Sequence, residues 1–296
     1  MSGEAPRSQT ERGTDVPGPG DVPEVTVVTI NILRDLSRWP ERGSLLVEGL
    51  AELQPDLIAL QEVALPANTA QWLAERLNAG DPTGDRKGRP YTVHLCPKRN
   101  WESKREGIAI LSRLPVERET TLDLRSQNRV AQCVKVNLEG RPLVFVNGHY
   151  YWLPGESRER VKQVECLLQW FNAVPEDTAI VACGDFNGIP ESEAIRRMRT
   201  RFASAYAARH GREPEYTCPT PLARRPELLL DAAKVVLNLL VNRTLQPWRG
   251  TLDYIFVRDN LRVVDCEVVL NRPAPHDPTL YPSDHYGLAA RLKLCT

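Results

Sequence analysis

Short runs of β-branched and aliphatic residues recur along the chain and predict a set of buried strands. They occupy residues 25–30, 56–61, 107–112, 130–136, 142–148, 178–184, 252–257 and 261–270. Apolar runs of this length that end at Gly, Pro or polar residues are typical of strands inside a sheet. Some gaps between the runs contain a helical pattern, whereas others contain only a turn such as residues 139–142. This uneven spacing favours mixed sheets over an all-parallel sheet.

Three segments between the strand runs repeat their apolar residues with the period of a helix. The clearest is residues 157–174, where Ser157 is placed to cap the first turn. Two further helices are expected at residues 43–53 and 69–80. Because helices alternate with strands, we expect an α/β fold, a four-layer α/β/β/α sandwich of two mixed β-sheets flanked by helices.

The length of the chain, 296 residues, allows one large α/β domain with a substantial core. Residues 1–24 are polar and rich in Pro and Gly, which predicts a disordered N-terminal tail, so the folded domain is expected over residues 25–296. No apolar stretch near the N-terminus resembles a signal peptide. The most apolar later segment, residues 226–241, has polar interruptions and is too short to cross a bilayer. We therefore expect a soluble protein with no membrane span.

Charge and cysteine content narrow the cellular setting. The 38 Lys and Arg residues balance the 38 Asp and Glu residues. The net charge therefore indicates neither a nucleic acid nor a membrane partner, and a local surface has to supply any such affinity. The 7 cysteines are scattered, odd in number and without a CxxC pair. They are typical of reduced core residues, and we expect a cytoplasmic protein.

Five polar motifs lie at or just beyond the ends of predicted strands. They are TINIL with Asn31, LQEV with Glu62, NGHY with His149, GDFN with Asp185 and Asn187, and the final pair LDY with Asp253 and SDH with Asp284 and His285. A carboxylate at a strand end is held on rigid backbone and can still face a cleft. When buried and ionised without a partner it costs several kcal/mol. We therefore expect these residues to be partners in one site.

The residue types in these motifs suit phosphate chemistry. Glu62, Asp284 and the amide oxygen of Asn31 are hard oxygen donors, which bind Mg²⁺ or Mn²⁺ well and a soft metal poorly. His285, with Asp253 on its other ring nitrogen, would form a pair that can contact a phosphoryl oxygen or move a proton. Each residue alone also has a structural explanation. These explanations are a turn at Asn31 or at SDH, a satisfied loop histidine at His149, a helix cap at Asp185 and an ion pair of Asp253 with Arg249.

Taken together and in this order, the five motifs resemble those of the endonuclease/exonuclease/phosphatase superfamily, the metal-dependent phosphodiesterases related to pancreatic deoxyribonuclease and to cytoplasmic poly(A) deadenylases. The resemblance covers residues 25–294. It implies a metal-dependent phosphoric ester hydrolase in which water attacks phosphorus in line. Asp185 would orient and deprotonate that water, Asn187 would position the water or the phosphate, and His149 would donate a hydrogen bond to the developing charge. The expected cofactor is Mg²⁺, with Mn²⁺ as a substitute.

Several branches of the superfamily lack support in the motifs. Leu33 stands where apurinic-site endonucleases carry an acid, the CDRI motif of inositol polyphosphate 5-phosphatases is missing, and bacterial sphingomyelinases are secreted whereas this chain has no evident signal. LDYIFV followed by SDHYGL is similar to the deadenylase-like and tyrosyl-DNA-phosphodiesterase-like branches. We therefore favour a nucleic acid or nucleotide substrate. The alternatives are a phosphatase or lipid head-group phosphodiesterase of the same fold, and a catalytically silent binding module. The sequence indicates no obligate protein partner.

Two further segments have less specific patterns. Residues 97–106 interleave basic side chains with Trp101, as a phosphate-tracking loop with a base-stacking ring would. A solvated surface loop explains the same pattern. Residues 225–247 have the character of an insertion, and its apolar helix is expected to cover the core.

Overall fold

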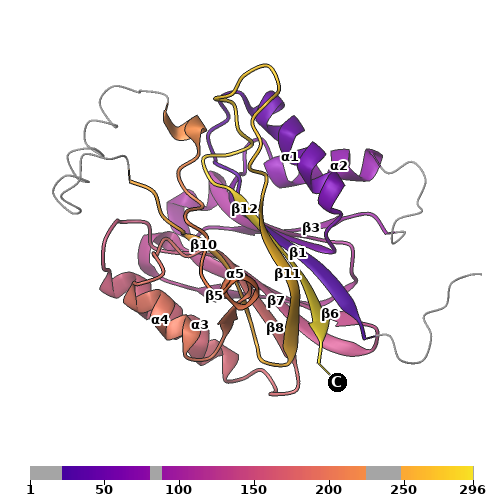
Figure 1. Ribbon diagram of the computed structural model, residues 1–296, viewed down its shortest axis with the longest axis vertical. Helices are drawn as coiled ribbons and strands as arrows, with labels where there is room; N and C mark the ends of the chain where they lie inside the picture. The colour runs from indigo at the N-terminus through magenta and orange to yellow at the C-terminus, as the bar shows by residue number, and fades with distance from the viewer. Residues whose placement is uncertain (1–21, 81–88, 225–247, 296) are drawn as a thin grey trace, which may run out of the picture.

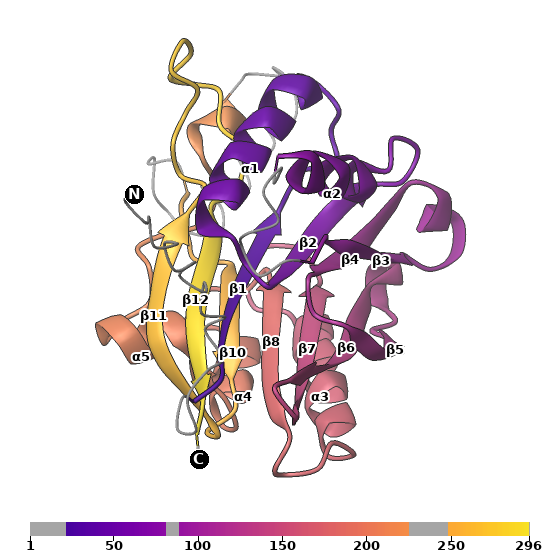
Figure 2. The same cartoon turned by 90° about the vertical axis from the view of Figure 1, so that its right-hand side faces the viewer.

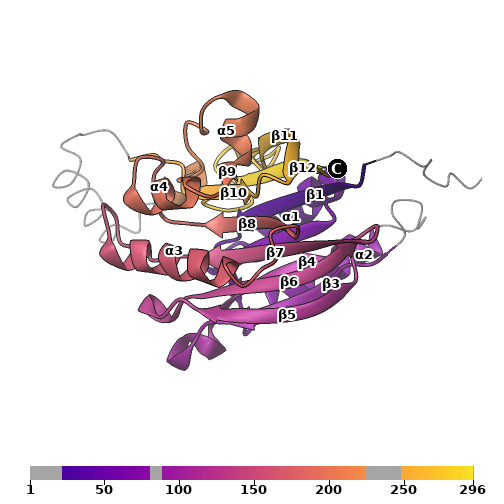
Figure 3. The ribbon, with the colours of Figure 1, turned by 90° about the horizontal axis from the view of Figure 1, so that it is seen from below.

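The structure, a computed structural model, describes residues 22–80, 89–224 and 248–295 (Figure 1). Two six-stranded sheets form its centre, with the strand orders β11-β12-β1-β2-β4-β3 and β5-β6-β7-β8-β10-β9. The sheets pack face to face with helices on their outer sides (Figures 2 and 3). The predicted four-layer sandwich is confirmed.

Both sheets are mixed, as the uneven spacing of the strand runs predicted. The first consists of β1 (Glu24–Asn31), β2 (Leu57–Ala64), β3 (Thr92–Pro97), β4 (Glu106–Ser112), β11 (Leu261–Val269) and β12 (Gly287–Leu294). The second consists of β5 (Val116–Asp123), β6 (Val130–Leu138), β7 (Arg141–His149), β8 (Ala179–Asp185), β9 (Ala203–Ser204) and β10 (Asp253–Val257). The pairs β1–β2 and β7–β8 are parallel. Each parallel pair brings two carboxyl ends to one edge of its sheet.

The helices cover the outer faces of the sandwich. On the first sheet lie α1 (Trp39–Leu53) and α2 (Thr69–Ala79), and on the second lie α3 (Arg158–Phe171) and α4 (Glu193–Arg199). The remaining short elements are α5 (Ala205–His210) and the 3-10 turns η1 (Asn100–Lys104), η2 (Ser126–Asn128) and η3 (Pro221–Arg224). Ser157 caps α3 as predicted, because its side chain accepts a hydrogen bond from the backbone nitrogen of Arg160.

The apolar core has three layers that follow from the alternation of side chains along the strands. Val25 and Val27 of β1 point into the layer between the two sheets, whereas Val28 and Ile30 point into the layer beneath α1 and α2. A third layer lies between the second sheet and the helices α3 and α4. The central strands are buried on both faces, which is why they read as continuous apolar runs.

The sequence did not predict the strands β3, β5, β9 and β12, the helix α5 or the three 3-10 turns. β5 has the sequence VERETTLD and lies at the edge of its sheet with much of its length exposed. Polar edge strands like this one lack the apolar run that marks a buried strand. β9 and α5 are too short to show a period.

Some sequence predictions fall at or beyond the limits of the described residues. Most of the expected tail, residues 1–21, and the expected insertion helix at 225–247 lie outside them. Glu24, which we assigned to the end of the tail, begins β1, and the carbonyl of Pro23 already accepts a hydrogen bond from Leu294. Across the described ranges, the structure has no helix with the length and apolar character needed to cross a membrane.

Candidate active site

Strand register brings three of the motif residues together at one edge of the second sheet. His149 is the last residue of β7, Asp185 is the last of β8 and Asp253 is the first of β10. Asp185 stands opposite His149 in the parallel pair and opposite Asp253 in the antiparallel pair. Three residues from distant parts of the chain therefore meet because their strands are neighbours.

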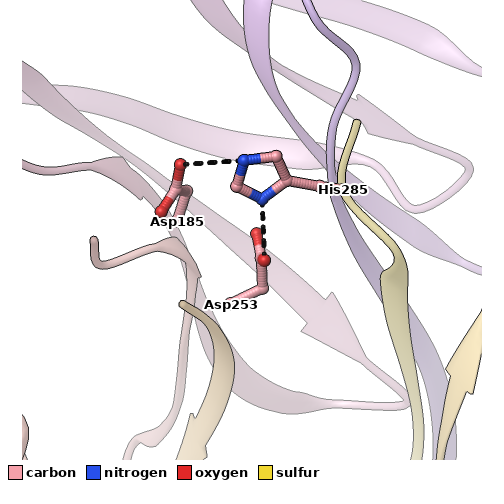
Figure 4. Close-up of side chains that lie close together, drawn as sticks. All are labelled: Asp185, Asp253 and His285. Atoms are coloured by element: carbon pink, nitrogen blue, oxygen red, sulfur yellow. Dashed lines mark hydrogen bonds and ion pairs between the residues drawn. The ribbon is translucent and has the colours of Figure 1, made fainter. Parts of the chain in front are cut away.

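His285 joins this group from the loop before β12. Its Nδ1 lies 2.9 Å from Oδ2 of Asp253, and its Nε2 lies 4.0 Å from Oδ2 of Asp185 (Figure 4). Asp253 is fully buried and also accepts a hydrogen bond of 2.6 Å from the hydroxyl of Thr217. The structure thus gives Asp253 an imidazole and a hydroxyl as partners rather than Arg249. The sequence did not point to Thr217, because a lone threonine far from every motif has no distinguishing signal.

The loop after Asp185 explains why GDFN begins with glycine. Gly184 has φ +135, and a Cβ at this position would lie 2.0 Å from the carbonyl oxygen of Gly148 on β7. Asn187 has φ 50, and its backbone nitrogen donates to Oδ1 of Asp185 over 2.9 Å. Its side-chain nitrogen donates to the carbonyl of Tyr150. Asp185 does not cap a helix, and the predicted role of Asn187 toward water or phosphate stays a prediction.

Glu62 reaches the site through a β-bulge. The register between β2 and β4 shifts between Leu60 and Val63, and Glu62 has φ 57, which is uncommon for a residue with a side chain. Its carboxylate accepts hydrogen bonds from Nδ2 of Asn31 over 3.3 Å and from the backbone nitrogen of Arg34 over 3.1 Å. The bulge therefore turns a half-buried acid toward the first motif.

Asn31 connects Glu62 to the buried cluster. Its amide nitrogen also donates to Oδ2 of Asp185 over 3.1 Å, and its amide oxygen accepts from the backbone nitrogen of Leu33. The nitrogen, rather than the oxygen, faces the carboxylates in this arrangement. The predicted role of Asn31 as an oxygen ligand requires its amide to turn over, and it stays a prediction.

Asp284 is tied to the same region by Ser283 and Arg42. The Ser283 hydroxyl donates to the carbonyl of Asn31 and contacts Oδ1 of Asp284 at 3.2 Å. The buried guanidinium of Arg42 donates hydrogen bonds to the carbonyl oxygens of Ile32, which follows Asn31, and of Pro282, which precedes Ser283. Burial lowers the pKa of Arg42, while Asp284, Asp35 and Glu62 act in the opposite direction. Asp284 and Glu62 therefore both act on the guanidinium of Arg42.

His149 has partners that the sequence did not suggest. Its Nδ1 contacts the guanidinium of Arg129, and its Nε2 lies 3.4 Å from Oδ2 of Asp185. Arg129 in turn lies 3.5 Å from Glu106, which also pairs with Lys98 at 2.7 Å. Lys98 belongs to the segment predicted to track phosphate or to be solvated, but it is only 6% exposed. An acid at the start of the buried strand GIAILS was the one available signal for this network.

The surroundings shift the pKa of Asp185 and of both histidines. Burial raises the pKa of Asp185 to about 7, although His285 and the hydrogen bonds from Asn31 and Asn187 oppose the rise. Burial, Arg129, Lys98 and His285 all lower the pKa of His149. Burial acts to lower the pKa of His285, but Cys218 and Asp253 outweigh it, so this pKa lies well above the usual range. Near neutral pH the site therefore holds a charged and a neutral imidazole around a titrating carboxyl group.

Two groups of side chains could hold a cation. Asp185, Asp253 and His285 offer ligand atoms within 4.8 Å of one another, but they are buried and already bonded among themselves. Glu62 and Asp284 are half-buried carboxylates, and both act electrostatically on the guanidinium of Arg42. Hard oxygen donors that keep contact with water fit Mg²⁺ or Mn²⁺. The second group is therefore the better candidate, and the first suits proton transfer.

A pocket of about 630 Å³ is lined by residues other than the motif residues. Its lining includes Ile189, Glu213, Trp248, Arg249 and Gly250, and none of the eight motif residues contributes to it. The chemistry of the site is therefore argued from the side chains at the strand ends and not from this cavity.

Comparisons with known proteins point to one family. The sequence model described as "Endonuclease/Exonuclease/phosphatase family" matches residues 28–285. The chain is 26% identical to nocturnin of Rattus norvegicus over 260 residues, which are 84% of this chain and 56% of that protein. It is 27% identical to tyrosyl-DNA phosphodiesterase 2 of Homo sapiens over 154 residues, which are 52% of this chain and 39% of that protein. The chain spans about half the length of the curated relatives it matches.

The fold itself recurs in solved structures. The human nocturnin catalytic domain with bound sulfate anion superposes with a TM-score of 0.68 at 23% identity. The match covers 92% of this chain and 94% of that one. Likeness at this identity speaks for the architecture. The residues matched by the family model begin in β1 and end at His285, so they contain all eight motif residues.

Proposed function

This chain belongs to the endonuclease/exonuclease/phosphatase family, and from this premise we propose that it is a Mg²⁺-dependent phosphodiesterase that hydrolyses nucleic acid or a nucleotide by in-line attack of water. The predicted family and its likeness to the deadenylase-like and tyrosyl-DNA-phosphodiesterase-like branches are confirmed. Membership of this family supports the predicted class, a metal-dependent phosphoric ester hydrolase. The observation that carries the proposal is the meeting of Asp185, Asp253 and His285 at one sheet edge, beside His149 and Asn31.

Asp185 is the proposed base. A carboxyl group whose pKa is about 7 is ionised often enough at neutral pH to accept a proton and still has a useful affinity for it. Its Oδ1 accepts a hydrogen bond from the backbone nitrogen of Asn187, and its Oδ2 accepts one from the amide nitrogen of Asn31. The carboxylate is therefore fixed in orientation before water binds.

The two histidines differ in charge and therefore in role. His285 is held by Asp253 as an imidazolium, which stabilises a negatively charged phosphoryl oxygen and can supply a proton. His149 is neutral and presents its Nε2 toward Asp185. It can donate a hydrogen bond to an oxygen bound beside that carboxylate without changing its own charge.

Glu62 and Asp284 would hold the divalent cation, with Asn31 joining them once its amide turns. When bound, the ion neutralises charge on the phosphate and its surroundings. The half-buried setting of both carboxylates leaves room for water ligands, which Mg²⁺ usually keeps. We propose Mg²⁺ as the ion because the donor set contains carboxylate and amide oxygens and no sulfur, and Mn²⁺ as a substitute.

Exposed aromatic rings favour a nucleic acid or nucleotide over a lipid head group. Trp152 is 54% exposed and follows His149 by three residues, and its backbone nitrogen is held by Gln127. Trp101 is 68% exposed on η1, and Asn100 of that turn bonds to Asn128 of η2. Rings in this setting can stack on bases. A relative, tyrosyl-DNA phosphodiesterase 2, is named for a DNA-linked substrate.

A turnover screen tests the proposed reaction and substrate together. The purified chain is incubated with Mg²⁺ or Mn²⁺ and single-stranded DNA or RNA, dinucleotides, bis-nitrophenyl phosphate, sphingomyelin or inositol phosphates. We expect hydrolysis of at least one nucleic acid or nucleotide substrate and its loss in EDTA. Turnover of sphingomyelin or inositol phosphates alone would contradict the proposed substrate, and no turnover of any ester would contradict the reaction.

Variants in the same assay link that turnover to the site. Asp185→Ala or His285→Ala should lower hydrolysis by at least about 10²-fold, the scale of losing a general acid or base. His94→Gln, on the edge strand β3, serves as a matched histidine control and should retain activity. Unchanged turnover in either site variant would refute its role.

We further propose a cytoplasmic location. All 7 cysteines are free, and Cys96, Cys133, Cys183 and Cys266 are buried among apolar residues. Thiols in this state are typical of a reducing compartment. Fractionation of the source cells, with an antibody against the chain, tests the location, and recovery from a secreted or periplasmic fraction would contradict it.

A further inference from the structure

The contacts of His149 determine where its ring carries a proton. Nδ1 faces Nη1 of Arg129, and a guanidinium can only donate hydrogen bonds. Nδ1 must therefore accept, so it has no proton. The single proton of a neutral ring is then on Nε2, the nitrogen that lies 3.4 Å from Asp185. His149 is 2% exposed, so bulk water has little access to either nitrogen.

Arg129 separates His149 from an acid that would otherwise act on it. Glu106 Oε1 lies 3.9 Å from Nδ1 of His149, 3.5 Å from Nη1 of Arg129 and 2.7 Å from Nζ of Lys98. The other oxygen of Glu106 accepts from Arg34 over 2.9 Å. With the guanidinium removed, the nearest acidic oxygen to Nδ1 is that of Glu106, which would draw a proton to Nδ1 or charge the ring.

We propose that Arg129 is a positioning residue that holds His149 as a neutral Nε2–H donor directed at Asp185 and at the oxygen that binds beside it. Arg129 does so by donating a hydrogen bond to Nδ1 of His149 and by pairing with Glu106, the acid nearest to that nitrogen. The consequence for catalysis rests on the proposed function, whereas the tautomer does not. His149 then serves as a fixed hydrogen-bond donor, and the charged acid of the site is His285.

The charges around His149 are consistent with this assignment from every side. Arg129 and Lys98 approach from the Nδ1 side, and Asp185 and His285 lie on the Nε2 side. Glu106, the acid nearest to Nδ1, is shared among three cationic side chains. The acidic group on the Nε2 side can accept the proton that the proposed tautomer places there.

Nitrogen NMR of the ¹⁵N-labelled full chain reads the tautomer directly. The sequence has only 5 histidines, and the signals of His149 are identified by their loss in His149→Gln. We expect a protonated Nε2 and an unprotonated Nδ1 throughout pH 5.5–8. A proton on Nδ1, or a ring that becomes charged within this range, would overturn the proposal on the wild-type protein alone.

Substitution of Arg129 tests the cause. In Arg129→Met we expect the Nε2–H form to give way to an Nδ1–H or charged ring, and Arg129→Lys should restore the original form in part. Arg99→Met is the matched control, because Arg99 is an exposed arginine paired with Asp123. Its substitution removes the same charge as Arg129→Met. An unchanged tautomer in folded Arg129→Met would show that another group sets it. If Arg129→Met does not fold, the nitrogen spectrum of Arg129→Lys, compared with that of the wild type, decides whether Arg129 sets the tautomer.

Kinetics then connect the tautomer to the reaction. In Arg129→Met we expect kcat to fall about tenfold with little change in KM, and a new loss of activity at low pH as His149 becomes charged. Weaker substrate binding alone, seen as a higher KM with kcat and the pH profile unchanged, would contradict the positioning role. Absence of turnover in the wild type combined with the expected spectrum would refute the proposed function and leave the assignment of the tautomer intact.

Discussion

Asp185 shows at the scale of one residue how a proposed catalytic role opposes stability. Its pKa is about 7 in the fold against 3.8 for an unperturbed group, and burial is the main cause. Between those values the folded chain binds more protons than the unfolded chain. The free energy of unfolding therefore decreases as pH rises from about 4 to about 7 and is level above that range with respect to this group. A buried carboxylate in the site thus costs stability at the pH where it is ionised.

Asp185→Asn should stabilise the chain at pH 8 in EDTA, because asparagine resembles the protonated carboxyl group and carries no charge. We expect the gain in free energy of unfolding to be about 2–4 kcal/mol, on the scale of 1.4 kcal/mol for each pKa unit, and to vanish near pH 4. Urea denaturation at several pH values measures it. Asp259→Asn, at an exposed position, is the control. Equal curves for wild type and Asp185→Asn would show that burial does not penalise this carboxylate.

The sequence singled out candidate site residues that stand in motifs and missed the residues that contact them. Asp185 and His285 were visible because a short pattern of neighbours accompanies each. Arg129 was not, because an arginine between η2 and β6 looks like any surface arginine until register places it against His149. The orientation of the Asn31 amide was equally invisible, since it depends on a backbone donor at Leu33. Partners of this kind are properties of tertiary contact.

At the scale of elements, the parallel pair β7–β8 depends on close approach at Gly148 and Gly184. Gly184→Ala places a Cβ 2.0 Å from a backbone carbonyl at φ +135, which combines overpacking with backbone strain. We expect a loss of at least about 3 kcal/mol in the free energy of unfolding. Gly140→Ala, at φ +89 with nothing within 4 Å, isolates the backbone term and should cost about 1 kcal/mol. Equal losses in denaturant titrations would mean that β7 and β8 can separate without penalty.

The elements found from sequence and those missed differ in where their side chains point. β1, β2, β7 and β8 are buried on both faces. Strands in this position need continuous apolar sequence, and those apolar runs identified them. β5 is held by backbone hydrogen bonds to β6 at a sheet edge, and backbone pairing leaves little trace in composition. The bulge at Glu62 was likewise unreadable, because it depends on how β2 pairs with β4.

At the scale of the molecule, the site lies where the two sheets are joined by buried polar contacts. Gln61 of the first sheet donates to Asn147 of the second over 2.8 Å, and Asn147 donates back to the carbonyls of Leu60 and Ala109. Gln61 precedes Glu62, and Asn147 stands two residues before His149. These bonds fix the two sheets against each other beside the candidate site, so the proposed ligands Asn31 and Glu62 on the first sheet and the proposed base Asp185 on the second keep a set geometry.

We propose that Glu62 and Asp284 bind one ion jointly. The two carboxylates come from opposite ends of the chain, and an ion that bridges them stabilises the whole domain in proportion to its binding free energy. At 100 times its Kd, Mg²⁺ should add about 2.7 kcal/mol, which for a domain of this size raises Tm by about 5–10 °C. Differential scanning calorimetry with and without Mg²⁺ measures the rise.

Glu62→Gln and Asp284→Asn should each remove most of that rise, whereas Glu52→Gln, on the exposed side of α1, should retain it. Each site variant removes a negative charge and an oxygen donor while keeping the shape of the side chain, so loss of the rise reports ligation rather than packing. If only one variant lost the response, the two carboxylates would not share an ion, and the cation would belong with the remaining acids at the strand ends.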